Sequence, residues 1–337
     1  MKQGQFETLY ASEWQRLEQI LTELETKSLK EGRFNRYKTT SKLSADDFSD
    51  YSRLYRKICH YHSLANERKY SSILVDHLGD MVVRGYSQLY QQNIPYREHF
   101  LRFFVSEFPS LLRQEARYFW VASAVLYLPA LLIFLAVIAA PEMVYTVLPP
   151  ADVLNFEEMY NPANRTLGSA RDSGTNWMMF GHYINNNIGV SFRTFASGIV
   201  YCLGSLFFLF YNGLLLGAVS GHLTNTGFTE TFFSFVAGHG SFELTAIAIS
   251  GAAGMKLGMA LIAPGNLSRI DALKRNAVIA IKLMYGVIAM LLIAAFIEAF
   301  WSSNNYFQFW QKYLVASLLW FIVTAYFLWS GRQYGSK

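Results

Sequence analysis

Cysteine is scarce in this chain of 337 residues, which contains only Cys59 and Cys202. One lies in a polar stretch and the other in an apolar stretch, so the sequence predicts neither a disulfide framework nor a zinc site of the CxxC type. The sequence also lacks a Walker loop, a GxSxG nucleophile motif, a dinucleotide-binding fingerprint and an HExxH metal motif. We therefore expect a protein that is not an enzyme and that has no cofactor and no metal ion.

No long apolar run precedes Phe119, which argues against an N-terminal signal peptide. Charge is unevenly distributed, because 18 of the 29 Lys and Arg residues fall within the first 118 positions. A basic segment before the first apolar run is typical of the cytoplasmic side of a membrane protein. We favour this interpretation over a nucleic-acid-binding patch, and the simpler alternative is a solubilising surface.

Residues 1–95 are expected to form a cytoplasmic helical domain, because their apolar side chains recur at helical spacing. The segment 96–118 is strongly amphipathic, with phenylalanine and leucine opposed to arginine, and Pro109 interrupts it. We expect an interfacial helix that lies on the cytoplasmic leaflet. The alternative is a helix packed within the soluble domain.

Residues 119–332 are expected to form a transmembrane domain. The region 141–193 is acidic on balance and is predicted to be an extracytoplasmic loop, whereas the basic N-terminal domain and C-terminal tail are predicted to be cytoplasmic. The expected fold is all-α: a polytopic helical membrane bundle of about five to six hydrophobic segments that follows the cytoplasmic helical domain. Four segments are long enough to cross a bilayer, namely 119–140, 194–219, 278–300 and 312–329.

The segment 229–262 must begin and end on the cytoplasmic side if the charge bias holds. We therefore expect a hairpin or re-entrant element, with a short first arm, a turn at residues 239–241 and a full helix from Phe242. Such a turn would place His239 and Glu243 in a protein-lined pocket or near the outer face.

Four polar residues are candidates for a functional cluster: His239, Glu243, Asn212 and Asn186. A charged group in an apolar segment needs a partner, water or a function, and His239 can touch Glu243 across one helical turn. Asn212 lies within an apolar span, which predicts an interhelical hydrogen bond. The simpler alternative is that Ser241 caps a helix and that Glu243 bonds to free N–H groups in its first turn.

Three further charged residues lie in apolar surroundings. We expect Lys256 to extend its side chain to the cytoplasmic interface, since it does not share a helical face with Glu243. Lys282 and Glu298 lie near opposite ends of one span, so both are expected to be interfacial.

Small residues form a stripe along one helical face after Glu243, and Ala260 lies off that stripe. Such stripes allow membrane helices to approach closely, so we expect helix packing there and, between chains, a homodimer. The residues expected to pack are Ala246, Ser250, Gly251, Gly254 and Gly258, together with Gly213 and Gly217 of the second span.

The runs NNNIGVSF, YNGLLLGAV and GHGSFELTAIAISGAAGMKLG resemble the stage II sporulation protein M family of integral membrane proteins. The resemblance covers about residues 105–330 and maps onto Asn186, Asn212, His239, Glu243 and the glycines. It implies a membrane protein that binds partners: cell-wall-degrading enzymes in spore formers, and elsewhere MoxR-type AAA ATPases and von Willebrand-type domain proteins. The basic domain and the acidic loop of this chain depart from the short sporulation form.

Three functions are consistent with these features. The first is a homodimeric scaffold in the bacterial inner membrane that organises partner proteins in the cell envelope. The second is a transporter or channel with a polar site at the His239/Glu243 hairpin. The third is a membrane hydrolase that uses the same two residues. We favour the scaffold, because no catalytic set is recognisable.

Overall fold

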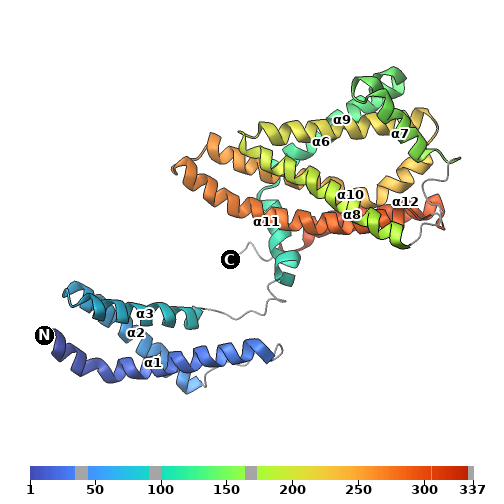
Figure 1. Cartoon of the computed structure of the whole chain (residues 1–337). Coiled ribbons are helices and arrows are strands. Elements are labelled where there is room, and N and C mark those ends of the chain that lie inside the picture. The colour runs from blue at the N-terminus through green and yellow to red at the C-terminus, as the bar shows by residue number, and fades with distance from the viewer. Residues whose placement is uncertain (35–44, 91–99, 164–172, 305, 333–337) are drawn as a thin grey trace. The chain divides into compact units, whose positions relative to one another are not determined.

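A computed structural model describes residues 1–34, 45–90, 100–163, 173–304 and 306–332 (Figure 1). Helices dominate throughout, and none of these residues forms a strand, which confirms the expected all-α fold. The chain divides into two compact units, Met1–His99 and Phe100–Lys337. The predicted boundary at residue 95 and the first residues of the predicted interfacial helix, 96–99, lie outside the described residues.

The first unit consists of the three helices α1 (Gln3–Phe34), α2 (Ala45–Glu67) and α3 (Ser72–Tyr90). Each helix contributes apolar side chains at helical spacing to one common core. Members of this core that are almost fully buried are Phe6, Leu17, Leu21, Tyr51, Ile58, Leu78 and Met81.

Glu13 joins α1 to α2 through two contacts, an ion pair of 2.5 Å with Lys57 and a hydrogen bond of 2.7 Å from the Tyr61 hydroxyl. Burial acts to raise the pKa of the Glu13 carboxyl, but the hydrogen bonds from Lys57 and Tyr61 hold that pKa below its usual value of 4.5. A carboxyl whose pKa is depressed by folding stabilises the fold above its unfolded pKa. That stabilisation is lost as the pH falls through the folded pKa.

Glu13→Gln is therefore expected to destabilise the first unit at pH 7, by less than about 1 kcal/mol because the pair is partly exposed. The difference from the unaltered chain should shrink well below pH 4.5. Hydrogen-exchange protection of α1 and α2 in the full chain, compared at neutral and acid pH, measures both effects. Glu18→Gln on the same helix is the control, and an equal loss at both pH values would contradict the assignment.

The second unit is a bundle in which long helices alternate with short helical connections. Its elements are η1 (Phe103–Glu107), α5 (Phe108–Gln114), α6 (Ala116–Ala139), η2 (Pro141–Thr146), α7 (Pro150–Tyr160), α8 (Ser173–Ala196), η3 (Ser197–Ile199), α9 (Leu203–Asn225), α10 (Thr229–Ile262), α11 (Arg269–Phe296), η4 (Ile297–Ser302) and α12 (Phe309–Trp329).

Among the described residues, five helices are long and apolar enough to cross a membrane: α6, α9, α10, α11 with η4, and α12. About 20 apolar residues span a bilayer, and the shortest of these helices has 21. The second unit therefore has the helices of a multi-pass membrane protein. The helical run continues from η1 through Pro109 into α5 and is interrupted only at Glu115, so the predicted interruption at Pro109 is wrong. Phe108 at the start of α5 is buried in the bundle, at 1% exposure, against Gly286 of α11.

Contacts at the two ends of the bundle fix the direction of its helices. Near the start of α6, Arg113 donates a hydrogen bond of 2.7 Å to the Phe327 carbonyl near the end of α12. At the opposite end, Asn225 of α9 donates one of 2.7 Å to the Val137 carbonyl of α6. The start of α6 and the end of α12 therefore lie at the same end of the bundle.

Helix α8 runs the length of the bundle, which the sequence analysis missed. Near its start, the ring of Trp177 contacts that of Phe300 in η4, with centroids 5.2 Å apart. Near its end, the Thr194 carbonyl accepts a hydrogen bond of 2.6 Å from Ser205 of α9. The prediction of an extracytoplasmic loop over 141–193 is therefore wrong from Ser173 onward, and its residues 164–172 lie outside the described residues. The asparagines of α8 lower its hydropathy and hide it from a search for apolar runs.

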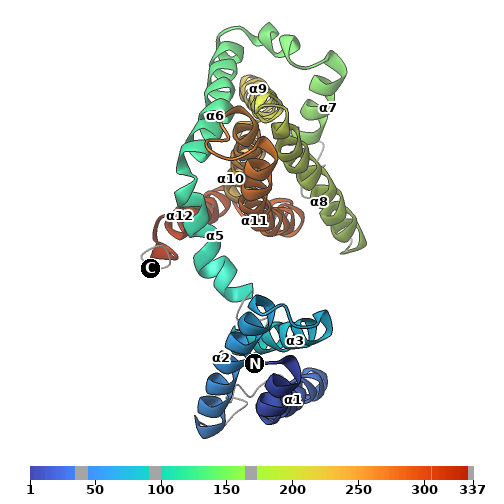
Figure 2. The same ribbon diagram turned by 90° about the vertical axis from the view of Figure 1, so that its left-hand side faces the viewer.

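Helix α10 is continuous over 34 residues, so the predicted hairpin with a turn at residues 239–241 is wrong. A continuous helix satisfies every backbone group within the segment, whereas a turn at membrane depth would leave some unpaired. The hairpin was expected because 229–262 had to begin and end on the cytoplasmic side. Helix α8 adds one crossing before α9, so α10 can cross the bundle once as a single helix. Figure 2 shows α10 at the centre of the bundle, and it contacts α6, α8, α9, α11 and α12.

The small residues of α10 pack inside the chain. A Cβ added to Gly254 would lie 2.1 Å from the Ser205 Oγ atom, and one added to Gly258 would lie 2.3 Å from the Cys202 backbone N. Gly251 meets α9 in the same way, and Ala246 and Ser250 are fully buried. Ala260 is also buried, at 1% exposure, because α10 is enclosed on all sides rather than along one stripe. The stripe is therefore not an exposed surface for a second copy.

Candidate functional site

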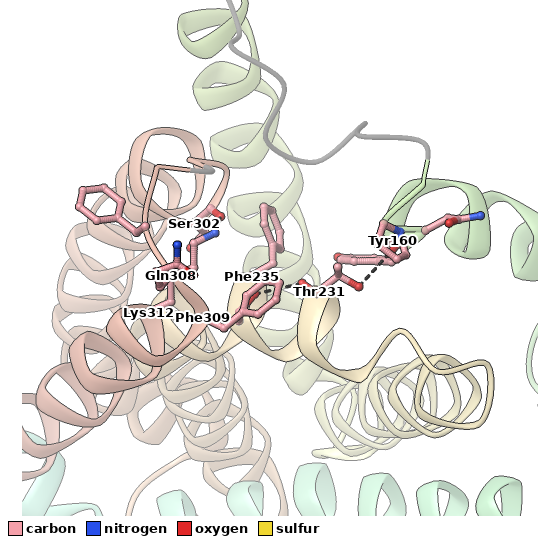
Figure 3. Close-up of a pocket in the computed structure, with 11 residues that line it drawn as sticks. Tyr160, Thr231, Phe235, Ser302, Gln308, Phe309 and Lys312 are labelled. Carbon is pink, nitrogen blue, oxygen red and sulfur yellow. Dashed lines mark hydrogen bonds between the residues drawn. The ribbon is translucent and has the colours of Figure 1, made fainter.

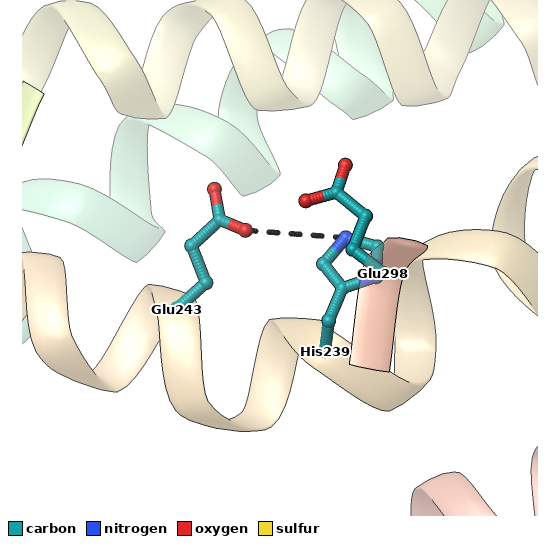
Figure 4. A group of neighbouring side chains, drawn as sticks. All are labelled: His239, Glu243 and Glu298. Atoms are coloured by element: carbon teal, nitrogen blue, oxygen red, sulfur yellow. Dashed lines mark ion pairs between the residues drawn. The ribbon is translucent and has the colours of Figure 1, made fainter. Parts of the chain in front are cut away.

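Three side chains capable of holding a metal ion or a proton meet inside the bundle. His239 and Glu243 come from α10 and Glu298 from η4, and one ligand atom of each lies within 4.8 Å of the others. Figure 4 shows the imidazole and both carboxyl groups pointing toward one another. The His239 Nε2 and Glu243 Oε2 atoms are 3.9 Å apart.

Local helix geometry brings the three together. His239 and Glu243 share a face of α10 because they are separated by one helical turn. Glu298 lies in η4, a π-helical turn that widens the end of α11 and directs the carboxyl inward. Glu298, which was expected to lie at the interfacial end of its span, is buried inside the bundle, at 8% exposure. The spacing of residues in the sequence did not predict that Glu298 faces the bundle, because a π turn changes which residues face inward.

The two carboxyl groups have little compensation from their surroundings. Among the described residues, neither has a Lys or Arg nitrogen within 4 Å, and the buried Glu298 Oε2 atom has no hydrogen-bond partner. Isolated buried carboxylates are strongly disfavoured in a low-dielectric interior. The site therefore requires a proton, a cation or water at these oxygens.

Asn187 of α8, not Asn186, is the asparagine that reaches the cluster. Asn187 is 3% exposed, and its amide lies beside the carboxyls of Glu243 and Glu298. It does not close a hydrogen bond to either, since its buried Nδ2 atom has no partner. The predicted site residue Asn186 is exposed and donates a hydrogen bond of 3.0 Å to the Asn187 Oδ1 atom. Helical register alone decides between the two neighbours.

Ser302 and Lys312 support the imidazole from the other side. The His239 Nδ1 atom is 3.2 Å from the Ser302 hydroxyl, and Lys312 donates a hydrogen bond of 2.9 Å to the Ser302 carbonyl. The ring is thereby oriented with Nε2 toward the carboxyls. Lys312 comes from α12 and is 6% exposed, so its ammonium group is held within the bundle.

A pocket of about 280 Å³ adjoins this support (Figure 3). It shares Ser302 and Lys312 with the cluster, and the ring of Phe235 in its wall contacts the His239 ring, with centroids 5.3 Å apart. Its remaining lining includes Tyr160, Thr231, Gln308 and Phe309. Burial, together with the nearby Glu298 and Glu243 carboxyls, raises the pKa of Tyr160, so its phenol stays neutral. The pocket therefore borders the residues that support His239, and none of the three cluster residues lines it.

The other predicted polar residues have local roles. Asn212 donates a hydrogen bond of 2.7 Å to the Phe208 carbonyl of its own helix, so the hydrogen bond described for it is not the interhelical one expected. Ser241 lies in the middle of α10 and bonds to the Gly238 carbonyl, so it caps no helix. Lys256 pairs at 2.6 Å with Glu115, which lies at the start of α6. Lys282, which is 42% exposed, pairs with Glu107.

Comparisons with known proteins agree with this division of the chain. A family model described as stage II sporulation protein M matches residues 121–303, which is more than half of the chain and includes His239, Glu243 and Glu298. A second, described as a domain of unknown function (DUF8413), matches residues 4–91 of the first unit. No curated protein and no solved structure matches the chain.

Proposed function

Because the chain belongs to the stage II sporulation protein M family, we propose that it is a membrane scaffold that holds partner proteins at the cell envelope. We place it in the bacterial cytoplasmic (inner) membrane, with both termini in the cytoplasm. The common end at which α6 begins and α12 ends supports termini on one side, and the basic character of the first 118 residues supports the cytoplasmic side. The proposal includes no chemical reaction.

The observation that carries this proposal is how closely the helices of the bundle approach one another. Cβ atoms added to Gly213 and Gly217 of α9 would lie 2.2 and 2.1 Å from the backbone carbonyl oxygens of Leu126 and Ala130 of α6. Contacts of this kind, at glycines against backbone, leave little freedom for one helix to slide past another. A rigid bundle is suited to presenting attached elements in fixed positions.

The first unit supplies a surface for a partner. It has its own buried core, yet it exposes large apolar side chains on its helices, including Leu9 of α1 and Val83 and Tyr86 of α3. Exposed apolar side chains that gather on one face of a helix are typical of protein-binding sites. We propose that a cytoplasmic protein binds there, and MoxR-type AAA ATPases are the first class to test. Von Willebrand-type domain proteins and cell-wall enzymes are further candidate partners of the scaffold.

The alternative function, a transporter or channel, depended on a broken hairpin around His239. Helix α10 is continuous at that position, so the discontinuous element that would build such a site is not formed. We keep the homodimer as part of the proposal, but the small-residue stripe of α10 does not support it, because that stripe packs within one chain.

Cross-linking in cells, followed by purification of the full chain from native membranes, tests the scaffold. We expect specific partners with the unaltered chain and a loss of cytoplasmic partners of about tenfold or more with Val83→Glu, which places a charge on the exposed apolar face of α3. A cross-linked species of twice the mass would identify the homodimer.

His77→Glu is the matched control, because it adds the same charge to another exposed position of α3, on a different face of the helix. It should leave partner recovery unchanged. Equal recovery from the unaltered chain and Val83→Glu would exclude the proposed surface, and the failure to recover any partner above background would contradict the scaffold itself.

A further inference from the structure

We propose that His239, Glu243 and Glu298 bind one divalent transition-metal ion inside the helical bundle, with Zn²⁺ as the expected ion. The proposal goes beyond the scaffold function and does not depend on it. It rests on three features of the described residues: the ligand set, the unpartnered polar atoms that face it, and the orientation of the imidazole.

The ligand set suits such an ion. One imidazole nitrogen and two carboxylate oxygens form a three-ligand site of the kind that zinc uses when a fourth position is left for water. A zinc ion about 2.0–2.2 Å from each ligand atom needs those atoms roughly 3.3–3.5 Å apart. The ligand atoms already lie within 4.8 Å of one another, so side-chain adjustments of about 1 Å complete the site. Imidazole among the ligands favours Zn²⁺ over Mg²⁺ or Ca²⁺.

Two unpartnered polar atoms lie at the same place, and one of them is outside the ligand set. The Glu298 Oε2 atom and the Asn187 Nδ2 atom are both buried without a hydrogen-bond partner, on residues that are 8% and 3% exposed. Glu298 belongs to the ligand set, whereas the Asn187 amide comes from α8, lies beside the Glu243 and Glu298 carboxyls and is not a ligand. A buried polar atom without a partner is costly. A bound ion would satisfy the Glu298 oxygen, and a water on that ion could accept a hydrogen bond from the Asn187 Nδ2 group.

The imidazole is held ready for coordination. Ser302 occupies the Nδ1 side at 3.2 Å, which leaves Nε2 directed at the Glu243 carboxyl. A hydrogen bond to the second ring nitrogen is the usual support of a metal-bound histidine, because it fixes the ring orientation. Lys312 in turn fixes Ser302 through its carbonyl, at 2.9 Å.

The charges around the site favour a divalent cation. The two carboxylates carry two negative charges, and the ammonium of Lys312 is directed to the Ser302 carbonyl rather than to either of them. Among the described residues, the neutral amide of Asn187 and the phenol of Tyr160 also lie near the carboxyls.

Metal analysis of the full chain, purified in detergent, tests this site. After treatment with a chelator and its removal, the chain is exposed to Zn²⁺ or Mn²⁺, and bound metal and melting temperature are measured. We expect one zinc ion per chain and a rise in melting temperature of about 5 °C at a free Zn²⁺ concentration 100-fold above Kd. Glu298→Gln and the double variant Glu243→Gln/Glu298→Gln should bind none and show no rise.

Two comparisons make the result decisive. The metal-free Glu298→Gln chain should melt at or above the temperature of the metal-free unaltered chain, because an unpaired buried charge has been removed, so loss of binding is not loss of folding. His222→Gln is the matched control: His222 pairs with Glu157 at 2.7 Å, no third ligand joins them among the described residues, and this variant should still bind one ion. An unaltered chain that binds no metal, or a double variant that binds as well as the unaltered chain, would overturn the proposal. A melting temperature that responds to pH but not to metal would assign the cluster to a proton instead.

Discussion

Replacing Gly217 with alanine is expected to destabilise the bundle by about 3 kcal/mol, at the upper end of what one added methyl group costs in a packed interior. The added Cβ atom would lie 2.1 Å from the Ala130 carbonyl oxygen and 2.5 Å from the Ile133 Cγ2 atom. The nearer obstacle is backbone, which no change of side-chain rotamer can move. Helices α6 and α9 would have to separate along much of their shared length, since Gly213 makes the same contact with Leu126 one turn earlier. Thermal unfolding of the full chain in detergent measures the loss.

Gly181→Ala is the matched control for this prediction. Gly181 also lies within a helix, α8, but a Cβ atom added there would meet nothing within 4 Å. Alanine has a higher helix propensity than glycine, by about 1 kcal/mol, so this variant should melt at the same or a higher temperature. If the two variants melt alike, the close contact between α6 and α9 does not contribute to stability as described.

Much of the architecture could be predicted from the sequence because it depends on local patterns. The apolar runs that became α6, α9, α11 and α12 are long and uninterrupted, and the helical spacing of Phe6 to Leu24 is clear. Helix α8 was missed because its asparagines interrupt the apolar pattern, and only the fold shows that it packs against α9, α10 and α11. The hairpin was predicted in α10 because α8 had not been counted as a crossing. Without α8, only a hairpin in 229–262 could return the chain to the cytoplasmic side.

The site was predictable only in part, for a related reason. His239 and Glu243 stand out because they are four residues apart in an apolar helix. Glu298 and Lys312 reach the same place through tertiary contacts, by way of a π turn and a helix end. Asn186 and Asn187 are neighbours of the same residue type, so the sequence does not distinguish them. Only the packing of α8 against α10 shows that Asn187 faces inward. The role of such a residue can be assigned only once the fold shows which face of its helix is buried.

Lys256→Met is expected to cost about 3–5 kcal/mol, because it removes one partner of a buried ion pair and leaves the other uncompensated. The Lys256 Nζ and Glu115 Oε1 atoms are 2.6 Å apart, and the two side chains are only 12% and 10% exposed. The pair joins α10 to the junction of α5 and α6, where Glu115 has a non-helical backbone conformation. Loss of the lysine therefore leaves a mostly buried carboxylate with no other Lys or Arg nitrogen within 4 Å among the described residues.

A second substitution separates this effect from a general loss of packing. In the double variant Lys256→Met/Glu115→Gln the stranded charge is gone, so most of the lost stability should return, and the two changes should be far from additive. Lys282→Met is the control: Lys282 pairs with Glu107 but is 42% exposed, and solvent screens such a pair, so a loss of about 1 kcal/mol or less is expected. Melting temperatures of these three variants, of Glu115→Gln alone and of the unaltered chain give the comparison. Equal losses from Lys256→Met and Lys282→Met, or a double variant as unstable as the sum of its parts, would mean that the Lys256 ammonium group reaches solvent after all.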